Sequence, residues 1–367
     1  MENNNSILIC PETKIPVVKK TIKEAEQILG TKLKKVDILN YNREILIDCE
    51  FVLLREDKKC VYPIIEDIPI LLCPEKLVSV NERRRIDVKD IKYREAYEEM
   101  AHYNNRGLES INIAEKSDIC RQIDEIKDNG NKYVDSFPNP KKIWIDALHD
   151  CLGQWDAYNF ISLVKGKRIL QLGGSGSHAV KFLLAGASEA WLLTPMLGEI
   201  KMAIHLAKKA GVKDRLKCVV GIAEEIPFKD NSFDAIYSGG CAHHFYMDLA
   251  MNECSRVLKE GGKIATVDPW KHPLYSFGIK LFGKREADVH CKPFTDTRIK
   301  SFRNNFSKTD VIHHGHILRY LFIAASKFKL VLNLSTMWKI HKLDDILFSW
   351  LPYLKRNGGS VTLLGEK

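Results

Sequence analysis

The sequence has no run of about 20 apolar residues without a charge, the length that a membrane-spanning helix needs, so it does not predict such a helix. It contains no internal repeat and no low-complexity segment, which speaks against solenoid and fibrous architectures. It also shows no nucleic-acid recognition motif. These absences favour a globular protein, with a small molecule rather than a nucleic acid as its partner.

The composition agrees with a globular chain, because 45% of the residues are hydrophobic and 28% are charged. A length of 367 residues predicts two domains. The net charge of +9 is spread over short Lys/Arg pairs, and solvated faces explain most of it. Nucleic acid, an anionic membrane surface and an acidic substrate stay open as alternative partners for a basic chain. Ten cysteines and a polar, Asn-rich start without a signal peptide favour free thiols in a reducing compartment, so we expect a cytoplasmic protein. The sequence predicts no oligomeric state.

The first eighty residues read as a small α+β module. Short β-rich runs lie at Ser6–Cys10, Glu44–Leu54 and Tyr62–Leu72, and a helical stretch lies at Thr21–Leu29. The runs Ile7–Pro11 and Tyr62–Leu71 resemble the zinc-ribbon family of transfer-RNA methyltransferase activator subunits. We therefore expect a zinc-ribbon-like domain at residues 1–80.

That family carries four cysteines at positions where this chain has Cys10, Thr13, Arg55 and Lys58. A structural zinc ion needs four thiolate or imidazole ligands at close spacing, and only Cys10 remains. Cys49 and Cys60 have the wrong spacing to replace the others. We therefore predict that the module folds without zinc.

Residues 81–137 are charged and helical in pattern, which predicts a helical linker. The turn cluster Phe137–Pro140 marks the start of a larger domain at residues 138–367, led in by a helix at Ile143–Leu163. Short apolar strands then alternate with helical segments: Arg168–Leu172, Ala190–Leu193, Leu216–Val220, Ala235–Ser238 and Lys263–Asp268. This alternation predicts an α/β fold with a parallel, doubly wound sheet.

Two further strands, Lys329–Leu334 and Ser360–Leu364, with a helix at Asp344–Lys355 between them, would complete a seven-stranded sheet. The stretch between them and the fifth strand, residues 270–320, reads as an insertion. Its aromatic residues favour a role in selecting the substrate. Contact of Leu274–Phe282 with a membrane surface is a further possibility for this insertion.

A Gly-rich turn, Gly173–Gly176, follows the first of these strands where a helix begins, so backbone can approach a ligand closely there. Ordered motifs follow it at Gly221–Phe228, Asn231–Ile236, Cys241–Phe245 and Arg256–Gly262. Together they resemble the class I S-adenosylmethionine-dependent methyltransferases of the type 11 kind. The resemblance implies a Rossmann-like domain with S-adenosylmethionine as cofactor.

The cofactor-binding positions that the resemblance implies are Gln171, Gly173, Gly174, Ser175, Gly176, Thr194, Ala223 and Glu224. Thr194 would lie near the ribose and Ala223 near the adenine. Three positions depart from the family, because Gln171, Thr194 and Ile222 stand where it has acids. Loss of a carboxylate that accepts two hydroxyl hydrogen bonds weakens binding by roughly tenfold or more. Thr194 can still make one hydrogen bond, and Glu199 follows it closely.

His243 and His244 follow the fourth strand, and either is a candidate general base with a pKa near neutrality. Asp268, at the end of the fifth strand, joins them as a candidate catalytic residue. An alternative is a metal site, because strand ends meet in one crevice and carry metal-capable side chains: His178, Cys241, His243, His244 and His272. More such residues lie in the insertion: His290, Cys291, His313, His314 and His316.

Three functions therefore remain open from the sequence. The leading hypothesis is methyl transfer from S-adenosylmethionine to a small molecule, with positioning of the methyl donor supplying most of the catalysis. The second is a metal-dependent enzyme that reuses the fold, and whether metal binds is left open. The third is a non-catalytic binding module, because fold alone does not fix function.

Overall fold

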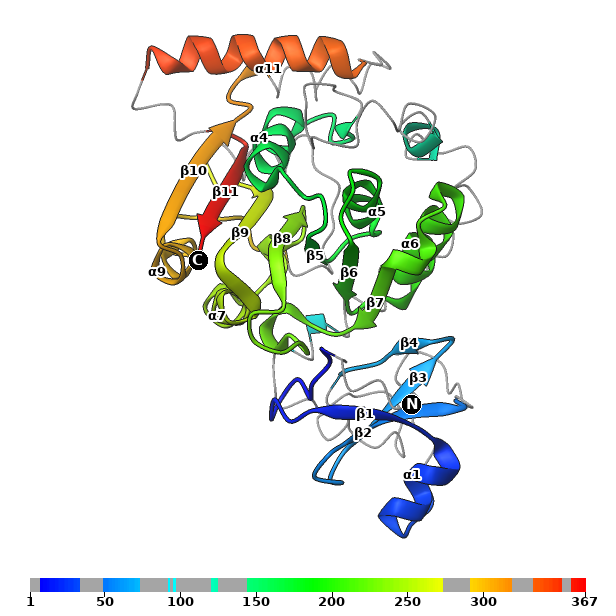
Figure 1. The fold of residues 1–367 in the computed structure, drawn as a ribbon. Helices are drawn as coiled ribbons and strands as arrows, with labels where there is room; N and C mark the ends of the chain where they lie inside the picture. The colour runs from blue at the N-terminus through cyan, green and yellow to red at the C-terminus, as the bar shows by residue number, and fades with distance from the viewer. Residues whose placement is uncertain are drawn as a thin grey trace, which may run out of the picture.

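The computed structural model describes residues 7–33, 49–72, 92, 95–96, 120–124, 144–272, 291–318, 333–351 and 358–367. These residues form a seven-stranded and a four-stranded β-sheet. The smaller sheet comes from the N-terminal part of the chain and lies at one end of the larger one (Figure 1).

The large sheet has the strand order β10-β11-β9-β8-β5-β6-β7. Its strands are β5 (Arg168–Leu172), β6 (Glu189–Thr194), β7 (Leu216–Val220), β8 (Phe233–Gly239), β9 (Leu258–Pro269), β10 (Lys308–His314) and β11 (Ser360–Glu366). Strands β5 to β9 pair in parallel. The predicted Rossmann-like α/β fold with seven strands is therefore confirmed.

Two details of the predicted sheet are wrong. The sheet is mixed rather than parallel, because β11 runs antiparallel to both β9 and β10. The sixth strand is Lys308–His314, inside the expected insertion, and not Lys329–Leu334, whose described end belongs to a helix: Asn333 caps α11 (Leu334–Ser349). That helix also begins ten residues before the expected Asp344. Apolar periodicity reports that a strand is buried but not its direction, and β10 alternates too many polar residues to stand out.

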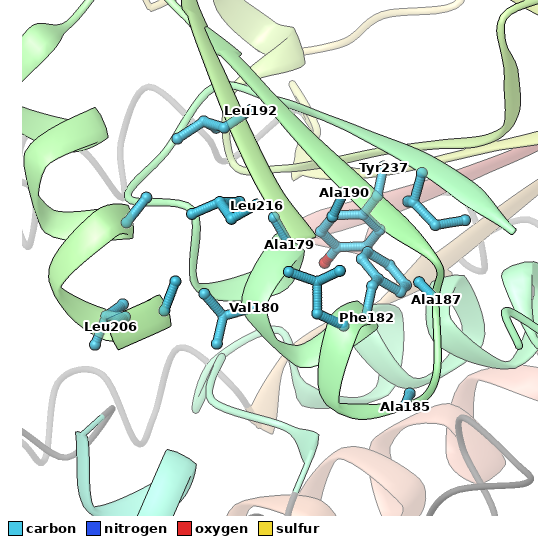
Figure 2. Close-up of a cluster of buried hydrophobic side chains, with 14 of the residues drawn as sticks. Ala179, Val180, Phe182, Ala185, Ala187, Ala190, Leu192, Leu206, Leu216 and Tyr237 are labelled. Atoms are coloured by element: carbon cyan, nitrogen blue, oxygen red, sulfur yellow. The ribbon is translucent and has the colours of Figure 1, made fainter. Parts of the chain in front are cut away.

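Helices cover both faces of the large sheet. One core lies under α4 (Cys151–Ile161), α5 (Ser177–Leu184) and α6 (Leu197–Ala210), and the other under α7 (Met247–Val257) and α9 (Lys300–Asn305). Because alternate strand residues point to opposite faces, Ile169 of β5 belongs to the first core and Leu170 to the second. Figure 2 shows the first core, where Phe182 of α5 packs edge-on against Tyr237 of β8.

The small sheet is antiparallel, with the order β1 (Val17–Thr21), β2 (Phe51–Arg55), β3 (Val61–Ile65) and β4 (Ile68–Pro69). The predicted helix is confirmed as α1 (Ile22–Leu29). Thr21 is its N-cap and forms a capping box with Glu24. In the predicted strand Ser6–Cys10, Leu8 and Ile9 make only isolated bridges. The missed strand is β1, an edge strand with two lysines, a composition that protects an edge but hides a strand in the sequence.

An isolated β-bridge and a shared core join the small sheet to the large one. Ile70 bridges Val220 of β7 in parallel, and the amide of Leu71 donates to the carbonyl of Val220 at 2.8 Å. Leu8 and Tyr62 share a buried core with Leu193 and Phe228 of the large domain. The predicted domain limits at residues 1–80, 81–137 and 138–367 stay predictions, because most of the linker lies outside the described residues.

Of the four expected zinc-ligand positions, Arg55 contacts the remaining cysteine, Cys10, through its guanidinium group. Arg55 is buried, donates from Nη1 to Sγ of Cys10 at 3.6 Å, and donates from Nε to Asp57 at 2.7 Å. The hydroxyl of Tyr62 lies 2.9 Å from the same sulfur. A cation fixed to the chain thus stands beside the one remaining cysteine.

Candidate active site

A pocket of about 320 Å³ opens where strands β5, β6, β7 and β8 end. Ligands of open α/β sheets bind at this edge of the sheet. The loops after the strands supply most of the lining: Gly173, Pro195, Met196, Glu199, Gly221, Ile222, Ala223, Glu224, Gly240, Cys241, His243, His244, Phe245 and Tyr246. The pocket therefore brings together residues of three predicted motifs, Gly173–Gly176, Gly221–Phe228 and Cys241–Phe245, although they are far apart in the sequence.

The Gly-rich turn after β5 requires glycine for two reasons. Gly173, Gly174 and Gly176 have φ angles of 70°, 74° and 74°, which residues with a side chain rarely adopt. A Cβ atom on Gly173 would also lie 2.7 Å from Sγ of Cys241, and one on Gly176 would lie 2.3 Å from Cβ of Ala203. Gly173 keeps the pocket wall open, and Gly176 lets α5 approach α6. The pocket lining includes Gly173 but not Gly174, Ser175 or Gly176.

Gln171 holds this turn in place rather than facing the pocket. Its Oε1 accepts the backbone N–H of Ala179 at 2.7 Å, and its Nε2 donates to the carbonyl of Gly173 at 2.8 Å. A carboxylate at this position could accept the first bond but could not donate the second. The substitution of the family acid by Gln171 therefore has a structural role of its own.

Thr194 is buried at the end of β6 and does not line the pocket. Its hydroxyl donates to the carboxylate of Glu199 at 2.9 Å and accepts the backbone N–H of Met196 at 3.3 Å. Glu199, on the first turn of α6, does line the pocket. Glu199 thus brings a carboxylate to the pocket lining within hydrogen-bond distance of Thr194.

His243 and Asp268 form a close pair at the pocket wall. Oδ1 of Asp268 accepts the backbone N–H of His243 at 3.0 Å and lies 2.9 Å from its Nδ1. Burial lowers the pKa of His243, but hydrogen bonds to Asp268 and Cys291 outweigh it and raise the pKa to about 9. The pKa of His243 therefore lies above neutrality, because a buried carboxylate stabilises the imidazolium. The His244 ring lies 4.2 Å from the His243 ring and also lines the pocket.

The set of residues proposed to bind a metal does not come together. His178 is buried against the Tyr158 hydroxyl, and burial lowers its pKa to about 4. Cys241 lies against the Gly-rich turn, and His243 pairs with Asp268. In the described part of the chain, no group of three or more His, Cys, Asp or Glu side chains is arranged to hold a metal ion. The geometry therefore does not support the metal-dependent alternative built on His178, Cys241, His243, His244 and His272.

The histidines of the expected insertion lie elsewhere. His314 on β10 stands between Asp156 of α4 and Asp345 of α11, at 2.7 Å and 2.6 Å. His313 packs against Trp270. His290 and the stretch 274–282 lie outside the described residues.

Sequence reasoning missed two residues of the pocket, Lys92 and Glu95. They come from the expected linker, where only a charged helical pattern was visible. Lys92 pairs with Glu225 at 2.8 Å, and Lys292 pairs with Glu95 at 2.6 Å. With Glu199 and Glu224, Glu95 brings a third carboxylate to the lining, against one lysine.

Comparison with known proteins identifies the region that holds this pocket. Residues 170–266 match the family described as "Methyltransferase domain". A ubiquinone/menaquinone biosynthesis C-methyltransferase UbiE of Ruegeria sp. strain TM1040 is 33% identical over 156 residues, which cover 38% of this chain and 56% of the relative. Its counterpart from Cereibacter sphaeroides strain KD131 is 29% identical over 150 residues, with the same coverage.

A geranyl diphosphate C-methyltransferase from Streptomyces coelicolor A3(2), solved with Mg²⁺, geranyl diphosphate and S-adenosyl-L-homocysteine, is similar with a TM-score of 0.43 and 15% identity. The similarity covers 59% of this chain and 78% of that one. The chain spans about half the length of the curated relatives it matches. The homologues of the region that builds the pocket are methyltransferases.

Proposed function

We propose that the chain transfers a methyl group from S-adenosylmethionine to a small molecule. The observation that carries this proposal is the pocket at the ends of β5 to β8, with its Gly-rich turn and three carboxylates. The match of residues 170–266 to the methyltransferase domain family supports it.

The residues present fit this cofactor. Gly173, without a side chain, lets Cys241 and the turn lie close together at the pocket wall, and the carboxylates of Glu199 and Glu224 in the lining favour a cationic ligand. When bound, S-adenosylmethionine supplies an electrophilic methyl group on a positively charged sulfur. Glu199 would hold the ribose hydroxyls in place of the missing acid at Thr194. Ile222 and Ala223, both apolar and at the pocket wall, would pack against the adenine.

The His243–Asp268 pair would handle the proton of the acceptor. The curated relatives are C-methyltransferases by name, and a carbon that gains a methyl group must lose a proton. Neutral His243 can accept that proton, and Asp268 then stabilises the imidazolium. A positive charge brought into the pocket opposes the imidazolium, so it lowers the pKa of His243 from about 9 towards neutrality.

Residues 291–299 would form the wall nearest to the acceptor. The amide of Lys292 donates to the carbonyl of His243 at 3.1 Å, and Arg298 donates to the same carbonyl at 3.2 Å and to that of Phe245 at 2.7 Å. These bonds place the described end of the expected insertion against the catalytic pair, which supports its predicted role in substrate selection.

The N-terminal module is proposed to be a zinc-ribbon relative that has lost its metal. The position of Arg55 beside Cys10 supports this, because the guanidinium supplies a positive charge where the family resemblance places a zinc ion. The cysteines of the described residues are free, which supports the proposed cytoplasmic location.

Titration calorimetry of the full-length chain with S-adenosylmethionine tests the proposed function. We expect one site per chain, and tighter binding of S-adenosylhomocysteine would also fit. Methyl transfer is then measured with radiolabelled cofactor and a metabolite extract as acceptor. Binding without transfer would favour the non-catalytic module, and no binding would refute the proposal.

A further inference from the structure

Helix α11 is held to the body of the protein by polar contacts. It packs over α4 at the outside of the large domain (Figure 1). Its buried residues are Met337, Trp338, His341, Asp344 and Phe348. Oδ1 of Asp344 accepts the backbone N–H groups of Ile317 and Leu318 at 3.2 Å and 3.3 Å. Asp345 is fixed to His314 of β10. The side of α11 that faces the protein therefore combines three apolar residues with two polar ones.

The opposite side of α11 and the residues that follow it are apolar. Leu343, Ile346, Leu347, Trp350 and Leu351 are exposed by 51%, 58%, 51%, 82% and 51%. Their spacing of three, one, three and one residues places them in one stripe, which we call the outer stripe. Apolar side chains thus lie on both sides of α11: Met337, Trp338 and Phe348 are buried beside His341 and Asp344, and the outer stripe faces the solvent.

The sequence fixes this orientation of α11. Turning α11 over would bury the outer stripe, but it would strip Asp344 and Asp345 of their partners and leave charges unpaired in the core, which is costly. The contacts of Asp344 and Asp345 thus hold the outer stripe towards the solvent. A contiguous exposed apolar patch of this kind marks an interaction surface.

The charges around the outer stripe indicate what binds there. At about 100° per residue, exposed Lys339 falls in line with the stripe and exposed Lys342 on its flank. Of the acids on α11, Asp344 is buried and Asp345 is half-buried and paired with His314. An exposed Trp, Leu and Ile on one face with lysines beside them is the composition of helices that lie in the headgroup region of anionic bilayers. The described residues contain no helix that is long and apolar enough to cross a bilayer.

We propose that the outer stripe of α11 docks the protein on an anionic lipid surface, with Trp350 and its apolar neighbours in the interface and Lys339 and Lys342 against the headgroups. This goes beyond methyl transfer and does not depend on it. The net charge of +9 adds a long-range attraction to the same surface.

The test is cosedimentation of the full-length protein with vesicles of phosphatidylcholine containing about 30% phosphatidylserine, and with vesicles of phosphatidylcholine alone. We expect binding to the anionic vesicles that weakens at high salt and little binding to the neutral ones. The double variant Leu347→Ser/Trp350→Ala should bind about tenfold or more weakly, because two anchoring side chains are removed. The double variant Lys339→Glu/Lys342→Glu should bind the anionic vesicles more weakly than the parent protein does. Its binding to the neutral vesicles should stay as low as that of the parent.

The matched control is Leu249→Ser, which changes a half-exposed leucine on α7, outside the outer stripe. It should bind vesicles as the parent protein does, and all variants should keep the parent melting temperature. Equal binding by the parent and the Leu347→Ser/Trp350→Ala variant would overturn the proposal. So would a parent dimer in solution that the same substitutions dissociate, because a second copy would then be the occupant.

Discussion

The hydroxyl of Thr194 donates a hydrogen bond of 2.9 Å to the carboxylate of Glu199. This bond aims an acid from the first turn of α6 into a pocket whose strand end lacks one. Glu199→Gln should weaken S-adenosylmethionine binding by about tenfold, because charge-assisted hydrogen bonds are lost. Thr194→Val should cause a smaller loss, since the carboxylate remains but is no longer oriented. Calorimetry measures both, with exposed Glu260→Gln as a control that should bind normally. An unchanged affinity in Glu199→Gln would remove Glu199 from the site.

The close contact between Gly173 and Cys241 leads to a second prediction. Gly173→Ala should reduce cofactor binding strongly, because its Cβ would lie 2.7 Å from both Cβ and Sγ of Cys241 and the φ of 70° adds strain. Cys241→Gly in the same chain removes the clash and should restore part of the affinity. Gly174→Val should block the approach of the backbone to the ligand. Its clash with the protein is milder, because a Cβ atom on Gly174 would lie 3.5 Å from its nearest neighbour, Nε2 of Gln171. If Gly173→Ala binds as the parent does, the ligand lies elsewhere.

The His243–Asp268 pair predicts a specific pH dependence. If neutral His243 is the base, kcat/KM for S-adenosylmethionine, which reports the free enzyme, should rise with pH up to the pKa of about 9. Asp268→Asn should move this rise to lower pH, because the carboxylate that stabilises the imidazolium is gone. His243→Ala should lower kcat by roughly 10²–10⁴-fold without loss of cofactor binding.

His244→Ala gives the matched comparison, since its ring lines the same pocket. Metal analysis of both alanine variants separates a base from a metal ligand, because loss of a ligand releases metal. Full activity of both variants would reduce the pair to packing.

His314 predicts that stability falls at alkaline pH. Burial lowers its pKa, but hydrogen bonds to Asp156 and Asp345 outweigh this and raise it to about 9. The raised pKa means that the stabilisation is fully present below the unfolded value of about 6.5 and is lost as pH rises through about 9. A shift of this size corresponds to up to about 3 kcal/mol. Denaturant unfolding at pH 6.5 and pH 10 should show the loss in the parent and a smaller one in His314→Gln, in which His243, whose pKa is also about 9, still loses its proton over the same range.

Zinc independence is the last prediction. Elemental analysis of the purified full-length protein should find no stoichiometric zinc, and chelators should leave the melting temperature unchanged. Arg55→Ala should destabilise the protein, because Asp57 and Cys10 lose their shared partner. An isolated fragment of residues 1–80 is a poor test, since its apolar residues pack into the large domain.

The sequence predicted the centre of the fold better than its edges. Arg168–Leu172 matches the central strand β5, because a buried parallel strand is a short apolar run between clear turns. β10 carries His313 and His314 among polar residues, and its place depends on pairing with the distant β11. Likewise, the motifs located the pocket and pointed to Glu199 close after Thr194, but no local pattern showed that Glu95 reaches the pocket or that Thr194 bonds to Glu199. Those relations arise only from tertiary contacts.

The bridge between Ile70 and Val220 joins the sheets of two predicted domains. Because Leu8, Tyr62 and Phe228 are buried together, opening the N-terminal part would expose the underside of β7 and of the loop that carries Ala223. The chain should therefore melt in a single cooperative transition rather than in two steps. Through the same contacts, a substitution at Leu8 or Tyr62 also changes the packing around Phe228 in the large domain.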